Sequence, residues 1–83
     1  MSEPIKREEK DVLIDARKKL GLTQQQVADK AEVAMRHYQM FEGGTRKLTS
    51  SSFRIATNVL NALELDVTAF ARGDYLLQEG ELK

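Results

Sequence analysis

The chain has 83 residues, of which 41% are hydrophobic and 31% are charged. These proportions are typical of one small globular domain, and the length is too short to enclose a catalytic cleft between two lobes. The absence of cysteine excludes a disulfide framework and a thiolate metal site, and it fits a reducing cytoplasm. No apolar run approaches the roughly 18 residues that cross a bilayer, and the start lacks the apolar centre of a signal peptide. We therefore expect neither a membrane span nor export.

Charge is distributed unevenly along the chain, although lysine plus arginine and aspartate plus glutamate both number 13. Residues 34–63 carry four bases and one acid, whereas residues 64–83 carry five acids and two bases. Clustered bases attract the phosphates of nucleic acids. The middle of the chain is therefore where we expect phosphate contact.

A first helix is predicted by apolar residues that recur with the three- and four-residue spacing of one helix face. Three bases at residues 17–19 lie in its last turn, where cations suit the helix dipole. Gly21 is a typical stop, because a residue without Cβ tolerates the left-handed conformation. The residues of the apolar face are Val12, Leu13, Ala16 and Leu20.

A second helix is predicted to begin after Thr23. Thr23 and Gln26 have the spacing of a capping box, in which each side chain bonds the backbone of the other residue. Leu22 and Val27 have the spacing of a hydrophobic staple around the same helix start. We expect this helix to end near Glu32.

A short third helix is predicted from Ala34 to Phe41. On a helical wheel Ala34, Tyr38 and Phe41 share the inward side. Gly43 and Gly44 are predicted to stop the helix, and the basic loop of residues 45–47 follows. The outer face carries two methionines, an arginine and a glutamine: Met35, Arg36, Gln39 and Met40.

Two further helices complete an all-α prediction of five. The polar residues 49–52 supply caps for a fourth helix, and Asp66 is predicted to cap a fifth that stops at Gly73. Leu65 and Phe70 have the spacing of a staple around the fifth. Residues 74–83 stay unassigned; the apolar residues 75–77 either cover the core or form a dimer contact. The predicted core face of the fourth helix carries Phe53, Ala56, Val59, Leu60 and Leu63.

The segment from Thr23 to Gly44 resembles the central motif of the phage-repressor (Cro and repressor type) helix-turn-helix family. It shares the Thr-Gln helix start, the small Ala28 where two helices cross, an apolar turn residue, two inward aromatic residues and a glutamate before glycine. The likeness extends over roughly residues 12–73. It implies a compact helical domain of residues 1–73 that binds double-stranded DNA. We expect residues 74–83 to be a tail that is either a dimer contact or disordered.

The resemblance also implies which residues contact DNA, because the family docks its second motif helix in the major groove. Arg36 is the most informative of these residues, since a guanidinium can bind two acceptors on a guanine edge. Arginine and lysine contacts to phosphate fix the register on the duplex. By position, the family's base-reading places fall on Met35, Arg36 and Met40, and Gln39 beside them is a further expected base contact. Gln24 and Ala34 correspond to positions at the DNA backbone, and the other expected backbone contacts are Thr23, His37, Arg46, Lys47 and Arg54.

Four residues either follow or depart from a further part of the family pattern. The family pairs an arginine near the end of its first helix with the glutamate that ends the third, which implies a structural ion pair of Arg17 and Glu42. Two residues depart from the pattern: Glu32 stands where a turn glycine is frequent, and Ala34 stands where a serine or threonine cap is frequent.

Several of these residues also allow a structural or a different chemical role. The two methionines also suit a core or a protein-binding patch. His37 stands alone, without the spacing of a metal site, so we expect a boundary residue and no metal. Gly43 and Gly44 lack the ending of a phosphate-binding loop. A single histidine and no paired inward carboxylates leave no nucleophile–base set, so we expect neither an enzyme nor a cofactor.

The function expected from the sequence is a cytoplasmic transcriptional regulator, a repressor that binds DNA as a homodimer. Two alternatives use the same helical fold: a protein-interaction module without DNA binding, and an antitoxin that also binds a toxin or effector protein.

Overall fold

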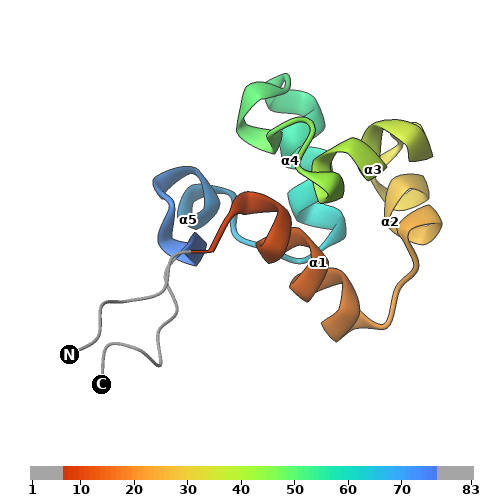
Figure 1. Ribbon diagram of the computed structural model, residues 1–83, viewed down its shortest axis with the longest axis horizontal. Helices are drawn as coiled ribbons and strands as arrows, with labels where there is room; N and C mark the ends of the chain where they lie inside the picture. Colours follow the sequence, from red (N-terminus) through yellow and green to blue (C-terminus); the bar gives the residue numbers. More distant parts are fainter. Residues whose placement is uncertain (1–6, 77–83) are drawn as a thin grey trace.

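The computed structural model describes residues 7–76, and all of their regular structure is helical (Figure 1). The predicted all-α class with five α-helices is confirmed. Two short 3₁₀ helices, η1 and η2, were not predicted. The elements in chain order are α1 (Glu9–Leu20), α2 (Gln24–Ala31), α3 (Met35–Gly43), η1 (Leu48–Ser50), α4 (Phe53–Ala62), α5 (Val67–Arg72) and η2 (Asp74–Leu76).

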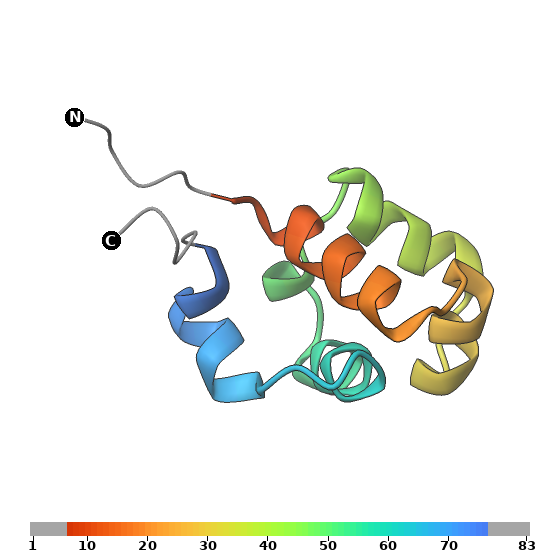
Figure 2. The same cartoon turned by 90° about the horizontal axis from the view of Figure 1, so that it is seen from below.

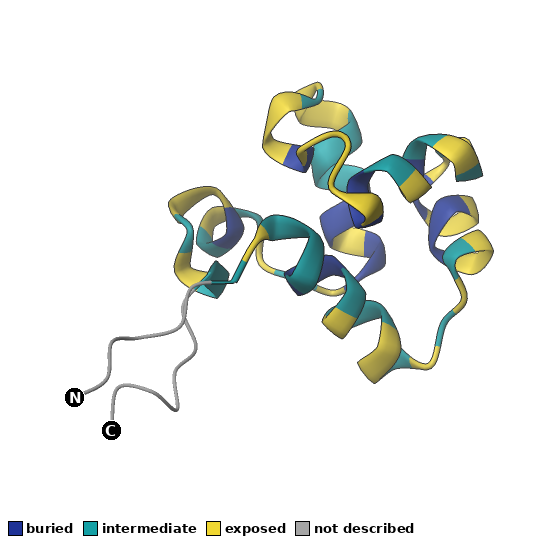
Figure 3. Ribbon diagram, in the orientation of Figure 1, coloured by how far each residue is buried: buried dark blue, intermediate teal, exposed yellow. Residues whose placement is uncertain are grey.

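Helix α4 lies between α2 and α5 (Figure 2). It packs against α2 on one side and α5 on the other, while α1 packs against α3 (Figure 2). Each helix turns its buried positions toward the interior of the molecule and its exposed positions outward (Figure 3). The largest fully buried side chains come from five elements and from the residue that follows α4, and they form one core: Leu13, Val27, Tyr38, Phe41, Leu48, Val59 and Leu63.

The structure confirms the predicted caps at the start of α2, at both ends of α5 and at the end of α1. The Thr23 hydroxyl accepts a hydrogen bond from the Gln26 backbone at 3.1 Å, and the Gln26 side chain accepts one from the Thr23 backbone at 2.8 Å. Asp66 accepts from the Ala69 backbone at 2.8 Å and so caps α5. Gly21 and Gly73 end α1 and α5 with φ angles of 71° and 82°, a region in which glycine meets no steric penalty.

Two residues predicted to face the core are exposed instead. Ala34 is the N-cap of α3 with extended backbone angles, φ −65° and ψ 141°, so the helical wheel does not apply to it. Phe53 is 77% exposed because it begins α4 at a point where neither α5 nor any other described element covers it. Both predictions were therefore wrong, and for the same reason: each residue lies at a helix end.

Other details of the helix ends also differ from the prediction. Helix α3 runs through Gly43, two residues further than expected, and it buries Glu42. Among the polar residues 49–52 only Ser52 acts as the cap of α4, by accepting from the Ile55 backbone at 3.2 Å. Glu32 ends α2 at φ 60°, a left-handed conformation that favours the glycine common in the family.

The residues after α5 cover the core. Tyr75 and Leu76 are partly buried against it, and the Tyr75 hydroxyl accepts a hydrogen bond from the Asp66 backbone at 3.0 Å. The Leu76 carbonyl accepts from the Arg7 backbone at 2.6 Å. Of the two interpretations given to residues 75–77, core cover therefore holds for Tyr75 and Leu76, and Leu77 lies outside the described residues.

Candidate nucleic-acid interface

Helices α2 and α3 meet through a tight turn of residues 32–34. Ala28 is fully buried at this junction, and its carbonyl accepts a hydrogen bond from the Val33 backbone at 3.0 Å. Val33 is partly buried and packs against the core. The small residue leaves room for the two helices to approach, and the apolar turn residue fills the corner, so α3 is held at a fixed angle on the scaffold.

The outer face of α3 presents side chains of two kinds. Arg36 and Gln39 are exposed, although Gln39 Nε2 also donates a hydrogen bond to Gln24 at 3.3 Å. Met35 and Met40 are only partly exposed, and Met35 packs against the core. The polar part of this face is therefore narrower than the four predicted base contacts suggest, and it is concentrated at Arg36 and Gln39.

A buried carboxylate anchors α3 from behind. Glu42 is 6% exposed, and its Oε2 accepts hydrogen bonds from Arg17 Nε at 2.7 Å and from the Tyr38 hydroxyl at 2.5 Å. Its Oε1 accepts from Arg17 Nη2 at 3.1 Å and from Gln24 Nε2 at 2.9 Å. The Arg17 guanidinium also donates to the Leu22 carbonyl at 3.0 Å. One ion pair thus joins α1, α2 and α3.

These contacts shift the pKa values of Glu42, Tyr38 and Arg17. Burial raises the pKa of Glu42, but hydrogen bonds from Arg17, Tyr38 and Gln24 lower it by more, so that its pKa lies below the ordinary value. Burial and the bond to Glu42 raise the pKa of Tyr38, and the bond to Glu42 raises the pKa of Arg17. At neutral pH the pair is therefore fully charged, and Tyr38 keeps its proton.

The residues expected to contact the DNA backbone fall into two groups. Arg46, Lys47 and Arg54 are exposed, as are Thr23 and Ala34, although Ala34 can offer only its backbone. The other group consists of partly buried residues. His37 stacks on Phe41 with ring centroids 5.0 Å apart, and the Gln24 amide is bonded to Glu42 and Gln39.

Lys10 is a basic residue that the sequence analysis missed. Its side-chain carbons lie beside Gly44, and it lines one hollow of about 500 Å³ together with Arg46 and Lys47. Its ammonium is 3.4 Å from Asp11 and 3.9 Å from Glu8. The sequence placed Lys10 in a mixed-charge run of residues 6–11, and no local signal indicates that the fold brings it next to the basic loop.

The described residues hold neither a group of metal ligands nor a membrane-spanning helix. Among residues 7–76, no three histidine, cysteine or acidic side chains come together as metal ligands. None of the helices in this region is both long and apolar enough to cross a membrane.

Comparison with known families agrees with this geometry. The sequence matches the helix-turn-helix family model over residues 13–67, which is more than half of the chain. The chain belongs to the helix-turn-helix family, of the phage-repressor type. That family consists of DNA-binding regulators, and the match spans α1 to the start of α5, including the whole anchor around Glu42. No curated protein matches the chain at a significant level.

Proposed function

We propose that this helix-turn-helix protein is a sequence-specific regulator of transcription that binds double-stranded DNA through α3 and acts as a homodimeric repressor. The observation that carries the proposal is the exposed Arg36 on a helix whose opposite side is fixed by the buried Arg17–Glu42 pair. A guanidinium held at a defined place can bind guanine O6 and N7 together. The exposed bases Arg46, Lys47 and Arg54 supply phosphate contacts around it.

The proposal is tested by replacing one base-reading and one phosphate-contacting residue. Arg36→Ala should remove the preference at one base pair and weaken binding to the best site by about 1–3 kcal/mol. Arg46→Ala should weaken all sequences alike and reduce the salt dependence by about one phosphate contact. Sites selected from random DNA and salt titrations measure both effects. An Arg36→Ala variant that selects the same sites as the wild type contradicts base reading by α3.

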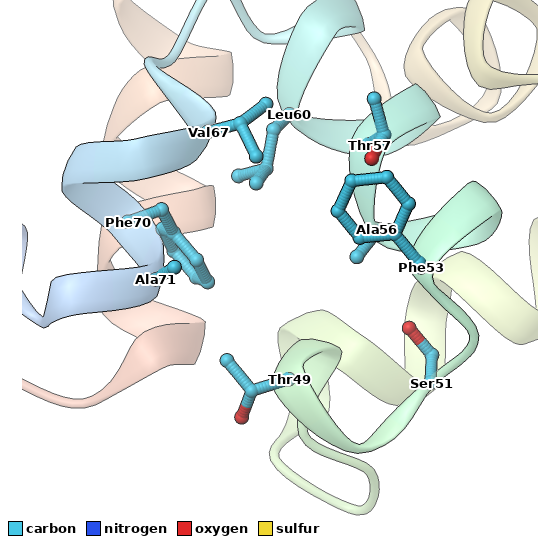
Figure 4. A pocket seen from close by; sticks show the side chains of 9 residues that line it. All are labelled: Thr49, Ser51, Phe53, Ala56, Thr57, Leu60, Val67, Phe70 and Ala71. Atoms are coloured by element: carbon cyan, nitrogen blue, oxygen red, sulfur yellow. The ribbon is translucent and has the colours of Figure 1, made fainter.

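A surface beside α4 supports the homodimer. Phe53 borders a hollow of about 410 Å³ between η1, α4 and α5 (Figure 4). A two-fold axis can place the Phe53 ring of each copy in the hollow of the other, which is the self-complementarity that a symmetric dimer requires. Phe53 is also the one exposed large hydrophobic side chain among residues 7–76. The hollow is lined by Thr49, Ser51, Phe53, Ala56, Thr57, Leu60, Val67, Phe70 and Ala71.

A dimer also follows from the size of the site. One recognition helix covers few base pairs, and the chain has no net charge to strengthen binding of a single copy. Two copies should bind half-sites about 34 Å apart. Phe53→Ser should abolish dimerisation and cooperative binding to a palindromic site, whereas Asn61→Ser, an exposed change elsewhere on α4, should not.

Sedimentation with and without DNA measures this difference. Wild-type dimerisation by the Phe53→Ser variant contradicts the proposed contact. Loss of binding to a protein partner, with dimerisation and DNA binding unchanged, would favour the alternative of an antitoxin that also binds a toxin or effector protein.

A further inference from the structure

The hydrogen bonds around Glu42 have a direction that reaches the protein surface. An ionised carboxylate only accepts hydrogen bonds, so the Gln24 amide must turn its NH₂ group toward Glu42, where Nε2 and Oε1 are 2.9 Å apart. The Gln24 carbonyl oxygen then faces the other way. It accepts a hydrogen bond from Gln39 Nε2 at 3.3 Å. The buried charge therefore fixes the orientation of two successive amides.

The last amide of this series is exposed. Gln39 lies on the outer face of α3, and one of its two N–H bonds is used by Gln24. Its carbonyl oxygen and its second N–H remain for a partner. A free glutamine can turn its amide to suit an acceptor or a donor, but Gln39 cannot do so without losing its bond to Gln24.

Base edges differ in what they offer to such a group. In the major groove adenine presents an amino donor beside an acceptor, and cytosine presents an amino donor. Guanine presents two acceptors, and thymine presents one acceptor and a methyl group. A fixed carbonyl oxygen with an N–H beside it matches adenine fully and cytosine in part.

We propose that Gln39 is a specificity-determining residue that selects a base with an amino group, adenine above all. Gln24 is the positioning residue, because its bond to buried Glu42 fixes the orientation of the Gln39 amide. This inference rests on the proposed DNA binding by α3. It adds a role to Gln24, whose second N–H makes no hydrogen bond within the described residues, so the expected phosphate contact is compatible with it. Arg36 reads its own base pair independently, because it makes no hydrogen bond to this series.

The test compares sites selected from random DNA by the wild type and four variants. The wild type should prefer adenine over guanine about tenfold at one base pair of each half-site. Gln39→Ala should abolish that preference. Gln24→Met keeps the length of the side chain but removes both of its hydrogen bonds, so it should reduce the preference at the same base pair to about twofold or less. In both variants the base pair read by Arg36 should keep its preference.

The most decisive variant is one that reverses the orientation of the Gln39 amide. Gln24→Lys replaces the amide with a group that only donates, so it can bond both Glu42 and the Gln39 carbonyl oxygen. Gln39 would then turn its NH₂ group outward, and the preferred base should change to guanine or thymine. The matched control is Gln25→Met, because Gln25 is an exposed neighbour whose amide bonds Asp29 within α2. This control should select the wild-type sites.

Several outcomes overturn the inference. An adenine preference that survives in Gln24→Met contradicts the positioning role, and so does a Gln24→Lys variant that still selects adenine. A Gln39→Ala variant with wild-type sites contradicts base reading by Gln39 while leaving the proposed function intact. Failure of the wild type to select any sequence would overturn both. Folding is not a confounding factor for Gln24→Met, because Glu42 Oε1 keeps its bond to Arg17 at 3.1 Å, and thermal unfolding checks this.

Discussion

The two ends of the molecule differ in how completely their polar and apolar groups are matched. At the α2–α3 end, each oxygen of the buried Glu42 carboxylate accepts two hydrogen bonds. At the α4–α5 end, Thr57 Oγ1 is buried without a hydrogen-bond partner in the described part of the chain, and Phe53 is exposed beside a hollow. The first end is complete within one chain and gives α3 a rigid support. The second end has unmatched groups, which fits the proposed contact with another copy.

The largest expected effect on the free energy of unfolding is at the α2–α3 end. Arg17→Ala leaves the carboxylate of Glu42 buried without its cation and removes the donor to the Leu22 carbonyl. Breaking a buried pair in this way costs about 3–5 kcal/mol in the free energy of unfolding. The neighbouring Lys18 is exposed, so Lys18→Ala should change it by less than about 0.5 kcal/mol. Denaturant unfolding compares the two, and equal midpoints would show that the anchor contributes nothing.

A smaller effect should appear as a pH dependence. Because the pKa of Glu42 is lowered in the folded protein, its ionised form stabilises the fold above the ordinary glutamate value and loses this contribution as the pH falls through the lowered pKa. Glu42→Gln should cost about 2 kcal/mol at pH 7. This difference from the wild type should shrink below pH 4.5, the ordinary value.

Unfolding of both proteins between pH 7 and pH 3 measures the difference. The other carboxylates are the same in the two proteins, so their contributions cancel. A gap that stays constant to pH 3 would mean that Glu42 is not the group that titrates.

The smallest expected effect on the free energy of unfolding is at the α4–α5 end. There the substitution should stabilise the fold. Thr57→Val keeps the shape of the side chain and removes the unpaired hydroxyl, so the fold should gain about 1 kcal/mol. Thr68→Val, at an exposed threonine on α5, is the control and should have little effect. Thermal unfolding of both variants measures the gain. A loss of stability in Thr57→Val would mean that the hydroxyl has a partner after all, and the contrast between the two ends would weaken.

Much of the fold could be predicted because the decisive signals are local. The start of α2 depends on Thr23 and Gln26, which are three residues apart, and the end of α5 depends on Gly73. Helical periodicity shows which residues share a face. It does not show where that face ends, and this is why Phe53 and Ala34 were assigned to the core.

The candidate site was predicted less completely than the fold. The helical wheel placed Arg36 and Gln39 on the outer face of α3, and both are exposed there. The bond between Gln24 and Gln39 joins two helices across 15 residues, and the approach of Lys10 to the basic loop depends on how α1 packs against α3. Such contacts are set by the tertiary arrangement, which no single segment specifies.

The hydrogen bond from the Arg7 backbone to the Leu76 carbonyl brings the two borders of the described chain together. At residue 76 the chain therefore returns to the segment that precedes α1. Shortening the chain after Gly73 would remove this bond together with the Tyr75 contact to Asp66, and the first turn of α1 would lose its neighbour. A deletion at one border thus disturbs the other, so a change in DNA binding after such a deletion cannot be assigned to the tail alone.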